Sequence, residues 1–165
     1  MVAHASIVNS KLKVKLNSHA HTCVVGDSCF IIHNHNRPVN VYSYDTKDDH
    51  KSAKTVDATV GYQDPQSGQK FMLVINQAIH IDGLVNHLLC PMQCHLNGVH
   101  ISEVPKFLAD SPSVTTYAIQ LLDPFNELHP LIIPLDLSGV TGSFDVYSLR
   151  IAEYENYQGQ ISIPA

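Results

Sequence analysis

The chain lacks several features that would assign it to a broad class of protein. It has no apolar run long enough to cross a membrane, and its first residues do not form a signal-peptide pattern. It has no cluster of lysine and arginine of the kind that binds nucleic acid, and it contains no internal repeat. We therefore expect an intracellular, cytoplasmic protein with neither a membrane nor a nucleic acid as partner.

Charged residues are also scarce, at 15% of the 165 positions, whereas hydrophobic residues make up 44%. This balance argues against disorder, and the length suits one domain with a sizeable buried core. The sequence therefore predicts a single domain over residues 1–165, in which the segment from about 105 to 165 is an extension.

Cysteine is limited to four residues, Cys23, Cys29, Cys90 and Cys94. They could form two disulfides in an oxidising compartment, but nothing in the sequence indicates secretion. Free cysteine is among the most buried residue types, so small buried thiols are the favoured interpretation.

The hydrophobic pattern predicts an all-β chain with one or two short helices. Residues 11–16 alternate strictly, with Leu12, Val14 and Leu16 on one face, as in a half-buried edge strand. A turn at 34–38 separates two of the expected strands, and Asn97-Gly98 ends an expected helix at 91–96. Strands are expected at 11–16, 30–33, 39–44, 55–62, 70–76, 116–121, 131–137 and 143–147, and a helical turn at 152–157.

Two motifs together carry a resemblance to a known family. The first follows the first strand and reads Asn17-Ser18-His19-Ala20-His21-Thr22-Cys23-Val24-Val25-Gly26. It resembles the active-site turn of copia-type retrotransposon aspartic proteases of algae and other protists, which carry Asp-Ser-His-Ala-Asp-Thr-Cys-Val-Val-Gly here. The second, residues 74–94, is similar to the copia pattern that ends in Leu-Leu-Ser-Pro/Val-x-Gln-Leu, and it continues as Asn97-Gly98-Val99-His100 and Pro105-Lys106-Phe107-Leu108. The resemblance covers roughly residues 3 to 155.

This resemblance implies a retropepsin-like closed barrel that acts as a homodimer. In such proteases each subunit supplies one aspartate to a shared site, where one carboxyl acts as base and the other as acid. Here Asn17 replaces the catalytic acid and His21 replaces the second acid of the motif. An amide cannot take a proton from water, so the turn is expected to be an inactive relic of the site. Its residues are Asn17, Ser18, His19, His21 and Thr22.

The strands at 55–62 and 70–76 are joined by a loop that contains Asp64, Pro65, Ser67 and Gly68. These turn-forming residues predict a hairpin. By position the hairpin could be the flap that closes over a retropepsin substrate, although an ordinary hairpin has the same pattern.

Histidine is abundant, with eleven residues, and two pairs have metal-ligand spacing. His19 and His21 are two residues apart, as are His33 and His35, so each pair could offer two imidazoles to zinc or copper. Histidine pairs on exposed loops are common, and the favoured expectation is that the chain needs no cofactor.

Three functions remain open at this stage. The chain is either an inactive retropepsin-like domain that binds extended peptide, a structural β protein that assembles with itself, or a histidine-rich metal binder. The expected partners are a second copy of the chain, as a homodimer or larger homo-oligomer, and an extended peptide. An engineered Asp→Asn change would explain Asn17 but not His21, which favours natural decay or reuse.

Overall fold

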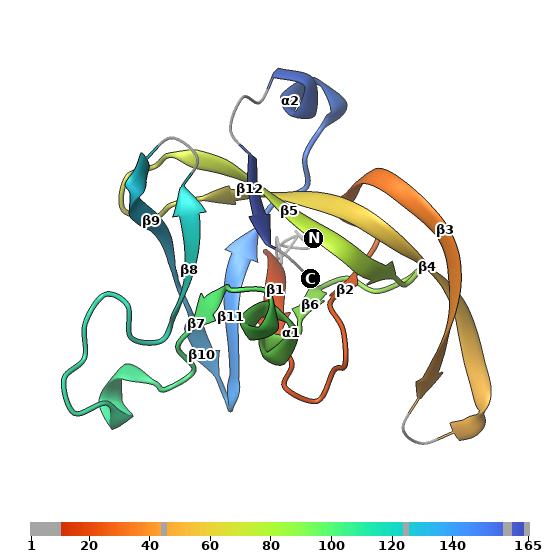
Figure 1. The fold of residues 1–165 in the computed structure, drawn as a ribbon, viewed down its shortest axis with the longest axis horizontal. Coiled ribbons are helices and arrows are strands. Elements are labelled where there is room, and N and C mark those ends of the chain that lie inside the picture. Colours follow the sequence, from red (N-terminus) through yellow and green to blue (C-terminus); the bar gives the residue numbers. More distant parts are fainter. Residues whose placement is uncertain (1–10, 44–45, 124–125, 157–159, 164–165) are drawn as a thin grey trace, which may run out of the picture.

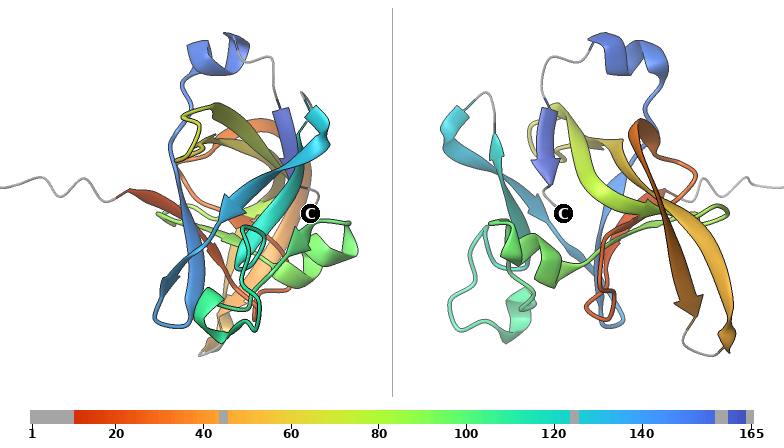
Figure 2. Two further views of the ribbon diagram at one scale, coloured as in Figure 1. Left: turned by 90° about the vertical axis from the view of Figure 1, so that its left-hand side faces the viewer. Right: turned by 45° about the vertical axis from the view of Figure 1, so that its right-hand side comes forward.

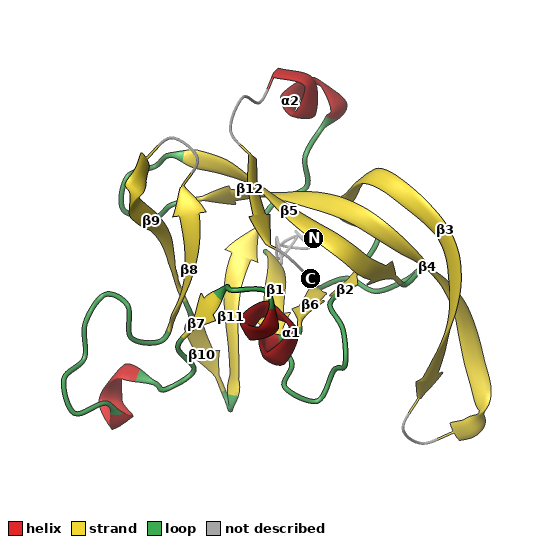
Figure 3. Cartoon of the chain, in the orientation of Figure 1, coloured by secondary structure: helices red, strands yellow, loops and turns green. Residues whose placement is uncertain are grey.

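Two β-sheets form most of this computed structural model, which describes residues 11–43, 46–123, 126–156 and 160–163. The larger sheet has the strand order β10 (Asp136–Ser138), β11 (Thr141–Val146), β1 (Leu12–Leu16), β6 (His87–Leu89), β2 (Val24–Val25), β5 (Lys70–His80), β4 (Thr46–Gln63) and β3 (Phe30–Ser43), and β12 (Gln160–Ile163) pairs with β5. The smaller sheet contains β7 (His100–Ile101), β8 (Ala118–Asp123) and β9 (Asn126–Pro134). The all-β class is thereby confirmed (Figure 3).

Helices are short, as expected. The first, α1 (Pro91–Leu96), has the predicted bounds, with proline in its first turn and a glycine of positive φ, Gly98, after its end. A 3₁₀ turn, η1, covers Lys106–Leu108, and α2 covers Ile151–Asn156. The last residue of the predicted helical turn, Tyr157, lies outside the described residues. In Figures 1 and 2, α2 lies at the opposite end of the molecule from the turn between β1 and β2.

The first strand, β1, lies inside the larger sheet. It pairs antiparallel with β11 and parallel with β6, so the expectation of an edge strand is wrong. Its alternation is real, because Val14 and Leu16 are buried while Lys13 reaches Asp145 on β11, with 2.7 Å between Nζ and Oδ1. Alternation reports that one face of a strand is buried, and it carries no information about the strand's edges.

Residues 30–43 form one strand, β3, where the sequence predicted two strands and a turn. The register with β4 shifts between Asn34 and Pro38, and Asn36 has a φ of 54°. Asparagine tolerates this left-handed conformation, and the Asn34 side chain accepts a hydrogen bond from the Asn36 N–H at 2.8 Å. The predicted turn residues therefore produce a bulge within a continuing strand. Tyr44, the end of the second predicted strand, lies outside the described residues.

The expected closed barrel is not found. Among the described strands, the order of the larger sheet ends at β10 on one side and at β3 on the other, and no pairing joins these two edges. An isolated bridge between Gly61 and Tyr147 connects β4 to the residue that follows β11. A single hydrophobic core nevertheless fills the space between the two sheets, with Val14, Phe144 and Ile119 among its members.

The β3–β4 hairpin extends well beyond the rest of the larger sheet. Pairing between β4 and β5 begins at Lys54 and His80, whereas pairing between β3 and β4 continues to Ser43 and Thr46. The outer part of the hairpin, residues 39–43 and 46–53, is therefore a two-stranded arm with no third strand among the described residues. Figure 1 shows this arm projecting from the body of the molecule.

Candidate functional site

The predicted relic turn begins at Asn17, directly after β1. The Asn17 N–H donates to Leu89 O at 2.9 Å, which ties the turn to the end of β6. The side-chain oxygen of Asn17 accepts a hydrogen bond from the His19 N–H at 3.1 Å, and its backbone oxygen accepts one from Ala20 at 3.2 Å. The amide is therefore fixed within a tight turn, at the position where the resemblance places an acid.

The other end of the turn is fastened to α1 and to the residue before it. The Cys23 N–H donates to Oε1 of Gln93 at 2.8 Å, and the Cys90 thiol donates to Ala20 O at 3.0 Å. The Cys90 N–H also lies 3.4 Å from the Cys23 sulfur. Sequence reasoning did not assign this positioning role to Gln93, although its place in the second motif was a signal.

Three buried thiols lie beneath the turn. Cys23, Cys90 and Cys94 are buried and free, which confirms the interpretation of small buried thiols for these three, while the free Cys29 is half-buried. A hydrogen bond from the Cys94 thiol lowers the pKa of Cys23, against the opposing effect of burial. The same hydrogen bond, together with burial, raises the pKa of Cys94. The cluster is therefore an internal hydrogen-bonded support for the turn.

The remaining side chains of the turn are mostly open to solvent. Ser18, His19 and His21 are exposed, and Thr22 is half-buried. Within the part of the chain that the structure describes, neither Ser18 nor Thr22 makes a side-chain hydrogen bond. A nucleophilic hydroxyl needs a base within hydrogen-bond reach, so the turn does not present an activated serine or threonine.

The predicted β4–β5 hairpin is present, with Gln63 paired to Lys70. Asp64 organises its tip by accepting hydrogen bonds from the Gln66 N–H at 3.1 Å and from the Ser67 hydroxyl at 2.7 Å, and Gly68 supplies a φ of 72°. The tip, with Pro65, borders pockets formed with β9 and β11. In Figure 1 it lies beside β9, away from the turn between β1 and β2.

The two histidine pairs do not form one metal-ligand group. The rings of His33 and His35 meet edge to face, with centroids 4.6 Å apart, and His35 Nε2 lies 2.9 Å from Oδ1 of Asp57. Burial alone would raise the pKa of Asp57. Hydrogen bonds from His35 and from the backbone of Gln77 outweigh this effect, so the pKa of Asp57 lies below its usual value. His35 and Asp57 form a hydrogen-bonded pair between β3 and β4, whereas the other histidine pair lies exposed on the turn.

A separate group of three side chains has the arrangement of metal ligands. Among the described residues, Asp27, His80 and Asp82 are the one group of three such side chains whose ligand atoms lie within 4.8 Å of one another. Oδ1 of Asp27 lies 3.8 Å from Nε2 of His80, and Asp82 lies 3.7 Å from Nδ1 on the other side of the ring. Asp27 and Asp82 are both exposed, at 58% and 95%, and Lys54 is the strand partner of His80, so a cation would meet two solvent-exposed ligands and a nearby positive charge.

Sequence reasoning missed the buried His87 in the middle of the larger sheet. It is fully buried on β6, where Nδ1 accepts a hydrogen bond from the Gly26 N–H at 3.0 Å and Nε2 lies 3.0 Å from the Ser28 hydroxyl. Burial, with a smaller contribution from His80, lowers its pKa to about 4. Because the Gly26 N–H occupies Nδ1, the ring proton belongs on Nε2, which donates to Ser28. His87 therefore cannot serve as a base for that hydroxyl.

Comparison with models of protein families, with curated proteins and with solved structures finds no match for this chain. Within the described ranges, no helix is both long and apolar enough to span a bilayer.

Proposed function

We propose that this chain is a retropepsin-like domain, derived from a copia-type retrotransposon polyprotein, that binds extended peptide without cutting it. One observation carries the proposal. The two motifs behind the resemblance are about 70 residues apart in sequence, yet they lie against each other. Asn17 is bonded to Leu89, and Cys23 is bonded to Gln93 and Cys90. This is the contact expected if the first motif is an active-site turn and the second its supporting segment.

The absence of cleavage follows from the group held in that turn. Asn17 is fixed by the His19 N–H and has no proton that titrates near neutral pH. If two copies formed a shared site, symmetry would place an amide at both catalytic positions. Neither copy would then activate a water molecule, whereas the backbone and the surrounding surface would remain able to hold a peptide.

The β3–β4 arm is the best-placed element for peptide binding. The outer edge of β3 has no partner strand among the described residues, and Ile31 and Ile32, which precede the arm on β3, are 41% and 36% exposed. An extended peptide, or β3 of a second copy, can add to such an edge through backbone hydrogen bonds. In Figure 1 the free end of the arm and the turn between β1 and β2 point toward the same end of the molecule. The arm is thus a stronger candidate for a flap than the β4–β5 hairpin.

Restoring the acids tests the proposal. Three variants, Asn17→Asp, His21→Asp and the double variant, are compared with the unmodified chain on one peptide library between pH 4 and 7. We expect cleavage by the two variants that carry the Asn17→Asp change, and none by His21→Asp alone, which adds a carboxylate at the wrong position. The unmodified chain should bind the peptides that these two variants cleave, but should leave them intact.

Native mass spectrometry supplies the second measurement. A dimer of the 18.2 kDa chain should appear at 2 × 18.2 = 36.4 kDa. Cleavage by the unmodified chain would contradict the proposal. So would a folded, dimeric Asn17→Asp variant that neither binds nor cuts any peptide in the library. Large open-ended assemblies in place of a dimer would favour the structural alternative, in which the β3 edges pair from copy to copy.

A further inference from the structure

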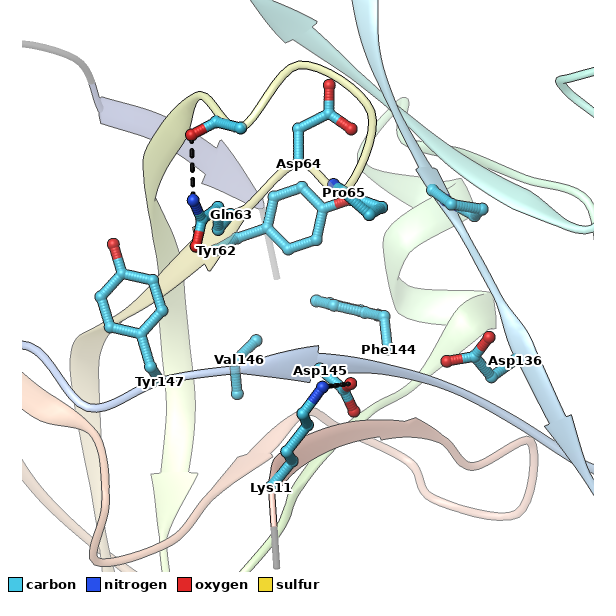
Figure 4. A pocket seen from close by; sticks show the side chains of 12 residues that line it. Lys11, Tyr62, Gln63, Asp64, Pro65, Asp136, Phe144, Asp145, Val146 and Tyr147 are labelled. Atoms are coloured by element: carbon cyan, nitrogen blue, oxygen red, sulfur yellow. Dashed lines mark hydrogen bonds and ion pairs between the residues drawn. The ribbon is translucent and has the colours of Figure 1, made fainter. Parts of the chain in front are cut away.

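One pocket on the described surface contains no residue of the relic turn in its lining. It has a volume of about 590 Å³ and lies between the tip of the β4–β5 hairpin and β11 (Figure 4). This volume is within the range of ligand-binding clefts. Its apolar surface comes from Tyr62, Phe144, Val146 and the two prolines Pro65 and Pro134.

The aromatic floor of this pocket is rigidly built. The rings of Tyr62 and Phe144 meet edge to face with centroids 5.9 Å apart. Tyr147 forms a wall, and two backbone hydrogen bonds of 2.9 Å hold it to Gly61. A Cβ atom at Gly61 would lie 2.2 Å from the Tyr147 ring, so the glycine is what allows the ring to approach this closely.

A polar atom inside this pocket has no partner. Tyr62 is 3% exposed, and its hydroxyl makes no hydrogen bond with any described residue. Burial raises the pKa of Tyr62 to about 12, and the negative charges of Asp64 and Asp136 add to the shift. Figure 4 shows the ring pointing toward the side of the pocket where Asp64 and Pro65 lie. A buried hydroxyl without a partner is costly, and a ligand that bonds it would recover that cost.

The charges around this pocket are arranged asymmetrically. Asp145 is neutralised by Lys13 at 2.7 Å and by Lys11 at 3.7 Å. Neither Asp64 nor Asp136 has a cationic partner among the described residues. The end of the pocket near the Tyr62 hydroxyl is therefore electronegative and apolar at the same time.

We propose that this pocket binds an arginine side chain of a peptide. A guanidinium is planar and weakly hydrated, so it stacks on aromatic rings while it donates to carboxylates. Here it would donate one N–H to the Tyr62 oxygen and direct the others toward Asp64 and Asp136, while the apolar stem of the side chain packs against the exposed Pro65 and Pro134. The remaining volume accommodates the flanking peptide. The site is separate from the relic turn, so it does not depend on the function proposed above.

Matched short peptides test this site. A fluorescein-labelled Gly-Ala-Arg-Ala-Gly peptide is titrated with the full chain, and the same peptide with citrulline, which has the shape of arginine without its charge, is the comparison. Binding is followed by fluorescence anisotropy and by ¹H–¹⁵N spectra. We expect the arginine peptide to bind at least about tenfold more tightly than the citrulline peptide, because charge-assisted hydrogen bonds are lost in the latter.

Three variants locate the binding. Asp136→Asn should weaken binding of the arginine peptide by about twofold to fivefold, since one carboxylate is lost at a solvent-exposed site. Tyr62→Phe should weaken it by about threefold, as expected for one neutral hydrogen bond. Asp110→Asn, an acid outside the pocket, is the control and should leave binding unchanged.

Four results would overturn the proposal: equal binding of the two peptides, no binding at millimolar concentration, spectral changes confined to residues outside the pocket, or equal affinity of Asp136→Asn and the unmodified chain. Thermal melting of each variant checks that it is folded. Asp136 is exposed, so its substitution should not disturb folding.

Discussion

Acid should destabilise this protein through a single buried histidine. In the unfolded chain His87 takes up a proton as the pH falls through its ordinary pKa of 6.5, whereas in the folded protein it resists protonation until about pH 4. Between these values the unfolded state binds more protons, so the free energy of unfolding must fall as the pH is lowered. The stabilising effect of keeping His87 neutral is fully present above about pH 6.5 and lost toward pH 4.

The magnitude follows from the shift of 6.5 − 4, about 2.5 units. At about 1.4 kcal/mol per unit, the limiting loss is about 3 kcal/mol, of which about 2 kcal/mol is already lost at pH 5. The physical cause is local, because protonation of Nδ1 would set an N–H against the N–H of Gly26 at a fully buried position.

Urea unfolding at pH 7, 6, 5 and 4.5 measures this effect in the unmodified chain and in His87→Asn. The side-chain oxygen of asparagine can replace Nδ1 as acceptor for Gly26 but does not titrate. The variant should therefore be less stable at pH 7, by about 1–3 kcal/mol for the lost packing and the lost Ser28 contact, and should show a weaker dependence on pH. His21→Asn, at an exposed position, is the control and should retain the full dependence. If His87→Asn loses stability between pH 6.5 and 4.5 as steeply as the unmodified chain, His87 is not held neutral and the reasoning fails.

Two further predictions concern neighbouring parts of the larger sheet. Gly26→Ala should destabilise the fold by about 2–4 kcal/mol, because the Cβ of the alanine would lie 2.0 Å from the backbone oxygen of Leu84. An unchanged midpoint of urea unfolding would contradict this close approach. Cys29 should react slowly with iodoacetamide at pH 8 in the folded protein and much faster near pH 11, because burial, with the charge of Asp27, raises its pKa to about 11. Mass spectrometry of the alkylated chain measures this rate, and labelling at pH 8 as fast as in urea would show that the thiol is not protected.

Some structural features that depend on local sequence pattern were predicted correctly. The bounds of α1 followed from Pro91 and Asn97-Gly98, and the β4–β5 hairpin followed from the turn residues between two apolar runs. These features depend on residues close in the chain, so a short window of sequence contains the interactions that determine them.

The pairing of distant segments was beyond such reasoning. Nothing in the alternation of β1 indicates that it lies between β6 and β11, and the partner of Lys13 is 132 residues away. The same applies to the candidate sites. Asn17 and His21 stood out because a motif made them conspicuous, whereas Tyr62 and His87 matter only because folding buries their polar atoms.

The position of β1 also constrains the order in which the protein can be made. A ribosome releases Leu12–Leu16 before either neighbour of this strand in the sheet, and β11 comes more than 120 residues afterwards. The β3–β4–β5 meander needs only contacts between successive strands, so it can assemble while synthesis continues. Until Thr141–Val146 emerges, one edge of β1 lacks the strand that pairs with it in the folded protein. The nascent chain therefore carries a strand with one unpaired edge for most of the synthesis of this domain, and a chaperone that shields this edge would raise the yield of folded protein.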